Sequence, residues 1–120
     1  MPRNISFAMT TQQVRNRTKT VTRRYGWLFL KPEEILNGVE KAMGLKKGEK
    51  INRLCQIRVV SVRQEPLQAI TQEDVIKEGF PDWTPAEFIK MIVDNYGKHP
   101  SELINRIEFE YVDEGGKTGE

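Results

Sequence analysis

RTKTVTRR (residues 17–24) gathers four cations, three threonines and a single valine into one short stretch. In a strand, alternate side chains point to opposite faces, so one face would carry Thr18, Thr20, Thr22 and Arg24. Hydroxyls beside a guanidinium can hydrogen-bond a phosphate, a carbonyl or an amide. The alternative is that threonine is present only because it favours strands, whose exposed faces tolerate charge. The stretch by itself leaves both interpretations open.

The overall composition is that of a globular protein with one domain. The chain has 120 residues, of which 38% are hydrophobic and 30% are charged, and this length suffices for a hydrophobic core. No apolar run approaches the ~20 residues that a membrane span needs. The opening MPRNISFAM is too short and too polar for a secretory leader. We therefore predict a cytoplasmic protein without a membrane partner, and we favour a monomer.

Cys55 and His99 are the only cysteine and the only histidine of the sequence. An intrachain disulfide is therefore impossible, which fits a reducing compartment. A Cys/His metal cluster is excluded as well, whereas a magnesium ion held by carboxylates is not. We predict no cofactor, a buried apolar role for Cys55 and an exposed loop position for His99.

Charge is divided unevenly along the chain. Residues 1–63 hold 14 Lys/Arg and 4 Asp/Glu, a net charge of +10, whereas residues 64–120 hold 5 and 13, a net charge of −8. Such asymmetry favours a polyanionic partner for the basic half. The alternative is that the two halves neutralise each other within one fold.

Four helices are predicted. Three begin at threonines followed three residues later by a side chain that can close a capping box, namely Thr10, Thr71 and Thr84. The last of these starts is the strongest, because Pro85 takes the first helical position and Glu87 the third, with Trp83 and Phe88 as the flanking apolar pair. Gly79 and Gly97 are expected to end the second and third helices. A fourth helix is predicted from Pro32 to Met43, with Ile35, Leu36, Val39 and Met43 on one face.

Strand patterns lie between these helices. Ile5 and Phe7 alternate with polar residues. Residues 50–63 are predicted to form a long strand with Cys55, Ile57 and Val59 on one side and a bulge near Leu54, and residues 106–112 alternate as a half-buried antiparallel strand. The residues after 112 offer no apolar anchor. We therefore expect one domain over residues 1–112 and a mobile tail over 113–120. The order of elements predicts an α+β fold with a small curved sheet or barrel.

KTVTRR (residues 19–24) resembles the K-x-x-T-x-R signature of ASCH domains, a branch of the PUA-like superfamily. ITQEDVIKEGF (residues 70–80) resembles the family's helix that begins at a threonine and ends in glutamate and glycine. RIEFEYV (residues 106–112) is similar to its closing strand, and GLKKGEKI (residues 44–51) to its turn into a central strand. The likeness covers residues 5–112. The chain departs from the family in lacking a glycine just before the lysine and in a longer segment over 27–43.

The resemblance implies a small PUA-like β-barrel with flanking helices around a cleft, and a role in RNA or modified-nucleoside chemistry. Some similar proteins are amidohydrolases that remove an acyl group from N4 of cytidine, and others bind or cut RNA. The working lysine, threonine and glutamate of those amidohydrolases fall on Lys19, Thr22 and Glu78. The motif's arginine falls on Arg24.

This trio is chemically reasonable. A partly desolvated lysine can take the proton of a threonine hydroxyl, and a glutamate can pair with that lysine or orient a water. Lys19 and Thr22 are three residues apart, so an unbroken strand would send them to opposite faces. We therefore expect Lys19 to lie in a turn before the strand, or a bulge to intervene. Glu78 is predicted at a helix C-terminus, where its charge opposes the macrodipole, and this favours a functional role.

The remaining candidates for binding RNA or substrate flank these three, namely Arg17, Thr20, Arg23, Arg24, Tyr25 and Trp27. The arginines would contact phosphate and the aromatics would stack on a base. As alternatives, Arg23 and Arg24 would pair with the acidic half, and the aromatics would pack in the core. Asp74 is interpreted as a capping residue, although with Glu78 it forms a thin candidate pair for metal-assisted RNA cleavage.

Two interpretations of the function therefore remain. The first is a binding module that recognises RNA or a modified nucleobase in a basic cleft lined by Lys19, Thr22, Arg24 and Glu78. The second is a small amidohydrolase or ribonuclease that uses the same residues. A module that binds an RNA chain would lose affinity steeply as salt rises, whereas an enzyme acting on free nucleosides would not.

Overall fold

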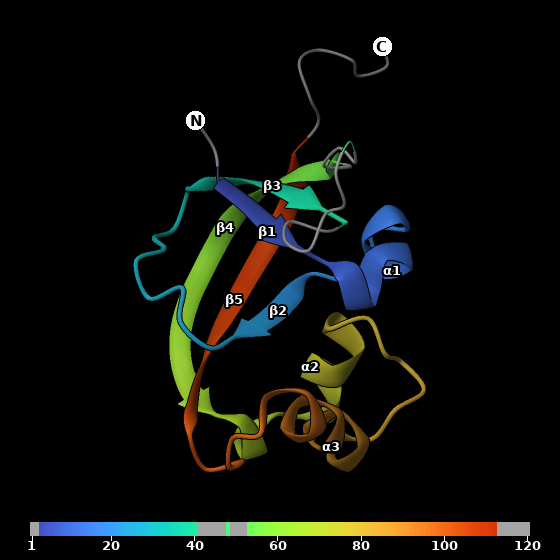
Figure 1. Cartoon of the computed structure of the whole chain (residues 1–120), viewed down its shortest axis with the longest axis vertical. Coiled ribbons are helices and arrows are strands. Elements are labelled where there is room, and N and C mark those ends of the chain that lie inside the picture. Colours follow the sequence, from blue (N-terminus) through green and yellow to red (C-terminus); the bar gives the residue numbers. More distant parts are fainter. Residues whose placement is uncertain (1–2, 41–47, 49–52, 113–120) are drawn as a thin grey trace.

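The computed structural model describes residues 3–40, 48 and 53–112. Its centre is one mixed five-stranded sheet in the order β1-β3-β4-β5-β2. The strands are β1 (Arg3–Ser6), β2 (Val21–Arg24), β3 (Ile35–Val39), β4 (Arg53–Pro66) and β5 (Leu103–Val112). β1 and β3 run parallel, and the other neighbouring pairs run antiparallel. The sheet curls into a half-barrel around which the helices pack (Figure 1). The predicted α+β class with a small curved sheet and flanking helices is confirmed.

In the described residues, three helices flank the sheet, namely α1 (Thr11–Arg15), α2 (Gln72–Lys77) and α3 (Pro85–Tyr96). Single 3-10 turns precede α1 and α2 at Ala8–Thr10 and Leu67–Ala69. α2 and α3 lie side by side below β2 in Figure 1. None of the helices in the described part of the chain is long and apolar enough to cross a bilayer.

Two hydrophobic clusters form the core. One lies within the curl of the sheet and includes Ile5, Phe7, Val14, Leu36, Ile57, Val59, Ile107 and Phe109. The other joins the helices to the ends of β4 and β5 where Pro66 pairs with Leu103. It includes Leu67, Ile70, Val75, Phe88, Ile92 and Ile104. The predicted alternation in the long strand is confirmed, because Cys55, Ile57 and Val59 are buried. β4 and β5 are long enough to serve both clusters.

Bulges let β4 bend across this distance. Gly38 faces Cys55 and Val39 faces Arg53, which leaves Leu54 as an extra residue. The bulge predicted near Leu54 is therefore confirmed. A second shift lies between Val59 and Ser61 against β5. Bulges sharpen the local twist and bend of a strand, which suits a sheet that curls.

The helix ends follow the capping rules in two cases of three. Thr84 and Glu87 form a complete capping box at α3, and the Thr71 side chain accepts a hydrogen bond from the backbone N–H of Asp74 at α2. Thr10 makes no side-chain cap, so the box predicted there is wrong although the helix exists. Gly79 and Gly97 follow α2 and α3 with positive φ, as expected. Trp83 stacks on Phe80, with ring centroids 4.4 Å apart.

The helix predicted from Pro32 to Met43 is wrong, because its described part contains strand β3. Ile35 to Val39 pairs with β1 on one side and β4 on the other, and this ladder outweighs the helical spacing of its apolar residues. Gly38 fits the strand for a steric reason: a Cβ there would lie 2.9 Å from Cys55 Sγ and 3.1 Å from a Phe7 ring atom. The backbone of β3 approaches the core too closely for any larger residue.

Some predictions lie outside the described residues, namely most of the 44–51 turn and the tail over 113–120.

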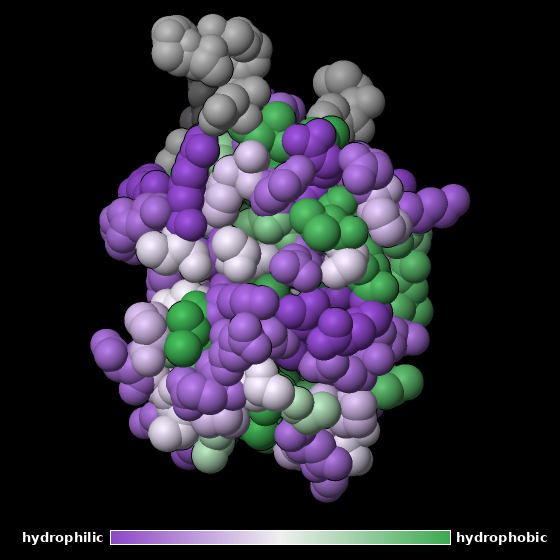
Figure 2. Space-filling model, turned by 180° about the vertical axis from the view of Figure 1, so that it is seen from behind, coloured by the Kyte–Doolittle hydropathy of each residue, from purple (hydrophilic) through white to green (hydrophobic). Residues whose placement is uncertain are grey.

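The described surface carries both hydrophilic and apolar side chains. Figure 2 shows hydrophilic side chains gathered across the middle of the face opposite to that in Figure 1, with apolar ones toward one edge. The most exposed large apolar side chains include Leu28 and Phe29, in the connection between β2 and β3.

Candidate functional site

A pocket of about 270 Å³ opens at the seam between the two edge strands of the sheet, β1 and β2. The segment 6–10 forms one wall, β2 and Lys19 form the floor, and residues at the ends of α2 and α3 complete the rim. The seam is bridged by Arg24, whose Nη2 donates to the carbonyl oxygen of Ser6 at 2.6 Å. The lining residues are Ser6, Phe7, Ala8, Met9, Thr10, Lys19, Thr22, Arg23, Arg24, Glu78, Phe80, Phe88, Met91 and Tyr96.

Lys19 reaches this pocket from a short extended segment that precedes β2. The backbone N–H groups of Lys19 and Thr18 both donate to the carbonyl oxygen of Gln13 in α1, and Thr20 N–H donates to the carbonyl oxygen of Lys77. β2 begins only at Val21. The expectation that Lys19 lies before the strand is therefore confirmed, and this position lets Lys19 and Thr22 line one cavity despite their spacing.

Lys19 and Glu78 form a buried ion pair. The Lys19 Nζ lies 2.7 Å from Glu78 Oε1 and donates also to the Glu78 backbone oxygen at 2.9 Å. Their side chains are only 4% and 3% exposed. Burial lowers the pKa of the Lys19 ammonium, and this effect outweighs the raising effect of Glu78, with further lowering by Arg24 and Arg23. The lysine also caps the C-terminus of α2, so the negative charge there has a direct partner.

Gly79 makes this arrangement possible. It follows Glu78 with a φ of +102°, which a residue with a Cβ rarely adopts. A Cβ there would also lie 2.7 Å from Gln13 Cγ, while the Gln13 amide donates to the Gly79 carbonyl oxygen at 3.2 Å. Gln13 therefore ties α1 to the turn that follows α2. The contact fixes Lys19 and Glu78 relative to each other.

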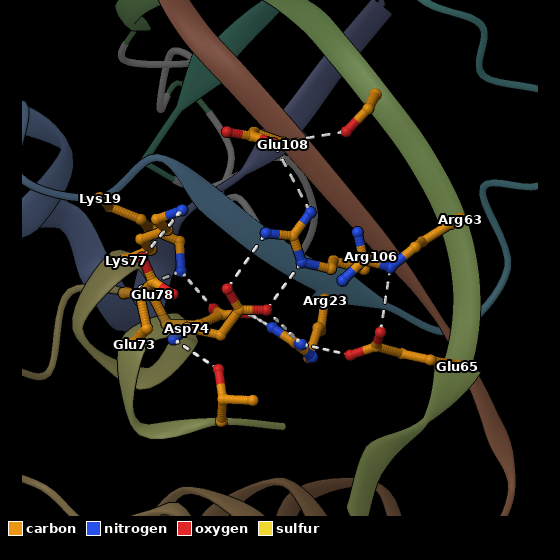
Figure 3. Close-up of polar contacts among 12 residues, drawn as sticks. Lys19, Arg23, Arg63, Glu65, Glu73, Asp74, Lys77, Glu78, Arg106 and Glu108 are labelled. Carbon is orange, nitrogen blue, oxygen red and sulfur yellow. Dashed lines mark hydrogen bonds and ion pairs between the residues drawn. The ribbon is translucent and has the colours of Figure 1, made fainter. Parts of the chain in front are cut away.

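Arg23 joins the Lys19–Glu78 pair to a larger network (Figure 3). Its guanidinium lies 3.1 Å from Glu78 Oε2, 2.8 Å from Asp74 Oδ2 and 2.6 Å from Glu65 Oε2. Burial lowers the pKa of Arg23, but the three carboxylates together raise it. The suggestion that Arg23 pairs with the acidic half of the chain is confirmed.

Asp74 is the second centre of this network. Arg106 holds its two carboxylate oxygens at 2.7 and 3.1 Å, and Arg23 adds a third hydrogen bond. Arg106 first, and then Arg23, hold the pKa of Asp74 well below its usual range. The Asp74 side chain thus forms ion pairs instead of the predicted cap, and only the Asp74 backbone N–H takes part in capping α2, by donating to Thr71. In the part of the chain that the structure describes, no group of three or more His, Cys, Asp and Glu side chains is placed to hold a metal ion.

Thr22 and Arg24 share the other face of β2. The Arg24 Nε donates to Thr22 Oγ1 at 3.0 Å, and the guanidinium lies 5.3 Å from the centre of the Phe7 ring. Burial lowers the pKa of Arg24, and Tyr96 and Glu78 oppose this shift. Within the described residues, no carboxylate forms an ion pair with Arg24, in contrast to Arg23. Arg24 therefore lines the pocket with a positive charge that no described carboxylate pairs.

The other candidate residues lie outside the pocket lining. The Arg17 guanidinium lies over the Tyr111 ring, and Thr20 pairs through its backbone with Lys77 and Phe109. Tyr25 packs edge-on against Tyr96, and Trp27 packs against Phe29. Of the segment 27–43, no described residue lines the pocket.

The walls were not anticipated from the sequence. They consist of apolar and aromatic side chains from three separate segments, listed here by segment as Phe7 and Met9, Phe80, and Phe88, Met91 and Tyr96. Each resembles an ordinary core or surface residue in its own sequence context, since no local spacing connects them. Only the folded chain brings them around the polar floor.

Solved structures provide the comparison for this fold. An ASCH domain from Lactobacillus crispatus JV V101 matches with a TM-score of 0.70 and 12% identity, over 91% of this chain and 78% of that one. A protein from Enterococcus faecalis V583 assigned to the family DUF984 matches with a TM-score of 0.64 and 21% identity, over 94% and 81%. A hypothetical protein, PH0355, matches with a TM-score of 0.64 and 14% identity, over 92% and 97%. Neither a family model nor a curated protein matches the sequence. The likeness in structure shows that this protein has the ASCH-like fold of the PUA-like type.

Proposed function

We propose that this protein recognises a modified nucleobase or nucleoside, free or as part of an RNA, in the pocket between β1 and β2. The observation that carries the proposal is the composition of this pocket. Thr22, Arg24 and Lys19 supply polar groups on the floor, and Phe7, Phe80 and Tyr96 supply flat apolar surface around it. A base has two apolar faces and one polar edge, so this combination suits it.

The charge arrangement favours a small ligand over a long RNA track. Arg23 and Arg106 are held by carboxylates, so their charges are compensated within the protein. A phosphate chain is bound mainly by uncompensated cations. Arg24 alone would supply such a charge in the pocket, which is enough to orient one nucleoside.

Isothermal titration of the protein with cytidine, N4-acetylcytidine, uridine and a short single-stranded RNA tests the proposal. We expect saturable binding of at least one nucleoside, with little dependence on salt, and a loss of about tenfold in affinity in Thr22→Val. Thr20→Val is the matched control, because Thr20 is a neighbour in sequence that does not line the pocket. Equal effects of the two substitutions, or binding only of the RNA with a steep decrease as salt rises, would contradict the proposal.

Amide hydrolysis is the second candidate, and one observation favours it. The Lys19 amine is buried, its pKa is lowered, and it lies 2.7 Å from Glu78 in the same pocket as Thr22. A lowered pKa makes more of the neutral amine available as a base for the threonine hydroxyl. The Thr22 hydroxyl oxygen would attack the acyl carbonyl, and the N4 amine of cytosine would leave after taking up the proton that Lys19 removed from the hydroxyl. Water would then hydrolyse the acyl ester on Thr22 and release the acid.

Incubation with N4-acetylcytidine tests this second candidate. We expect release of cytidine and acetate by the wild type and loss of turnover in Lys19→Ala. Lys77→Ala, which removes a partly exposed lysine at the end of α2 that does not line the pocket, should keep the activity. Absence of turnover in the wild type would eliminate hydrolysis of this substrate and leave recognition as the function.

A further inference from the structure

The ion pairs behind the pocket are balanced in charge. Among the described residues, one connected network joins four cations, Lys19, Arg23, Arg63 and Arg106, to four carboxylates, Glu65, Asp74, Glu78 and Glu108. Figure 3 shows this network running between β2, α2, β4 and β5. Arg24 is not part of it. The floor of the pocket therefore carries one positive charge that no carboxylate of the described chain compensates.

The hydrogen-bonding groups of the floor are mostly donors. Two nitrogens of Arg24 donate to Thr22 Oγ1 and to the Ser6 carbonyl oxygen, and its Nη1 has no partner in the described part of the chain. Thr22 accepts from Arg24, so its own hydroxyl hydrogen remains available. Lys19 uses two of its three N–H groups on Glu78.

The acceptors near the floor each already accept a hydrogen bond. Glu78 accepts from Lys19 through one carboxylate oxygen and from Arg23 through the other. The carbonyl oxygen of Ser6 accepts from Arg24. A ligand that presents an amine to this floor would meet donors and a positive charge, whereas a ligand that presents oxygens would meet partners.

We propose that the pocket selects an anionic ligand, a planar ring that carries one carboxylate, with the carboxylate at Arg24 and Thr22 and the ring between Phe7, Phe80 and Tyr96. This inference rests on the proposed function, because the ring is taken to be a nucleobase. It goes further by assigning the charge of the substituent. A charge-assisted hydrogen bond in a partly water-excluded site is stronger than its neutral counterpart, so the charge is the basis of selection.

A pair of isosteric probes isolates this charge. Uracil-5-carboxylate and uracil-5-carboxamide have nearly the same shape, and 5-aminomethyluracil adds a cation at the same position. We expect titration at neutral pH to give the carboxylate at least about tenfold tighter binding than the carboxamide, and the cation the weakest binding. Arg24→Gln should remove the preference, and Arg24→Lys should retain part of it. Arg15→Gln, at an exposed arginine outside the pocket, should leave it unchanged.

The outcomes separate the inference from the proposed function. Equal binding of carboxylate and carboxamide overturns the inference and leaves nucleobase recognition intact. Binding of none of the uracil compounds counts against nucleobase recognition, and benzoate against benzamide then tests the charge alone. A benzoate preference that Arg24→Gln removes supports the anion site, and no preference overturns it.

Because Arg24 also bridges β1 and β2, circular dichroism must show that Arg24→Gln is folded. If it is not, Thr22→Val takes its place, with an expected loss of carboxylate affinity greater than that for the carboxamide.

Discussion

Lys19 and Glu78 show how a charged pair is kept in the interior of a small domain. Removing two charges from water costs several kcal/mol each, and this cost is offset only when both partners and further hydrogen bonds are present. Glu78 meets this condition by accepting from Lys19 and from Arg23. Among the described residues, Lys19 therefore depends on the single carboxylate of Glu78, whereas Arg23 pairs also with Asp74 and Glu65.

Glu78→Gln should destabilise the fold by about 3–5 kcal/mol, because it leaves the buried Lys19 ammonium without its counter-charge and removes one of the three carboxylates around Arg23. Urea unfolding followed by circular dichroism measures this change. Glu73→Gln is the matched control on the same helix, since the Glu73 side chain is 79% exposed and its partner Lys77 is 4.0 Å away. We expect the control to change stability by less than about 0.5 kcal/mol. Similar losses in the free energy of unfolding in the two variants would show that the buried network does not depend on the Glu78 carboxylate.

Gly38 offers a second test at a single residue. Gly38→Ala places a methyl group 2.9 Å from Cys55 Sγ, and we expect a loss of about 1–3 kcal/mol in the free energy of unfolding. The double variant with Cys55→Ala removes the sulfur and should recover part of this loss, a coupling that a double-mutant cycle measures. Strict additivity of the two substitutions would contradict the close approach described here.

At the scale of elements, the sequence predicts structure that depends on nearby residues but not structure that depends on long-range pairing. Thr71 and Thr84 cap their helices through bonds to residues only three positions away, so the sequence contains the whole device. β3 is different, because its conformation depends on ladders to β1 and β4, and the apolar spacing of its residues also fits a helix. Cys55 and the segment around Leu54 were predictable as a bulged strand because alternation breaks there.

Thr84→Ala should destabilise the protein by about 1 kcal/mol, because the backbone N–H of Glu87 loses its acceptor and the capping box opens. Thr84→Ser keeps a hydroxyl at the same position and should retain most of the stability. Thermal unfolding of the three proteins measures the difference. If serine and alanine are equally destabilising, the hydroxyl does not cap α3.

For the whole molecule, the opposite charges of the two halves of the sequence partly neutralise each other inside the fold. Lys19 and Arg23 of the basic half pair with Glu65, Asp74 and Glu78 of the acidic half. Sequence patterns reveal an excess of charge but not its partners, which is why the polyanion and the internal interpretation remained equal. The lysine, threonine and glutamate of the site were recognisable from their motif. The walls and the balanced network were not, because both arise from long-range packing.

Because this network spans β2, α2, β4 and β5, its titration should affect the stability of the whole domain. Arg106 and Arg23 hold the pKa of Asp74 well below its usual range. Burial raises the pKa of Glu65, but Arg23 and Arg63 together lower it on balance. A carboxylate whose pKa is lower in the folded state contributes stability above its unfolded pKa, near about 4, and loses it as the pH falls from there toward the folded pKa. Urea unfolding between about pH 2 and pH 7 should therefore show stability decreasing below about pH 4.

Asp74→Asn should lower the stability at neutral pH by about 3 kcal/mol, because Arg106 and Arg23 lose a shared partner, and should flatten the acid decrease. Asp94→Asn, at an exposed pair with Lys90, is the control and should change stability at neutral pH by less than about 0.5 kcal/mol. An acid decrease as steep in Asp74→Asn as in the wild type would mean that other carboxylates carry the pH dependence.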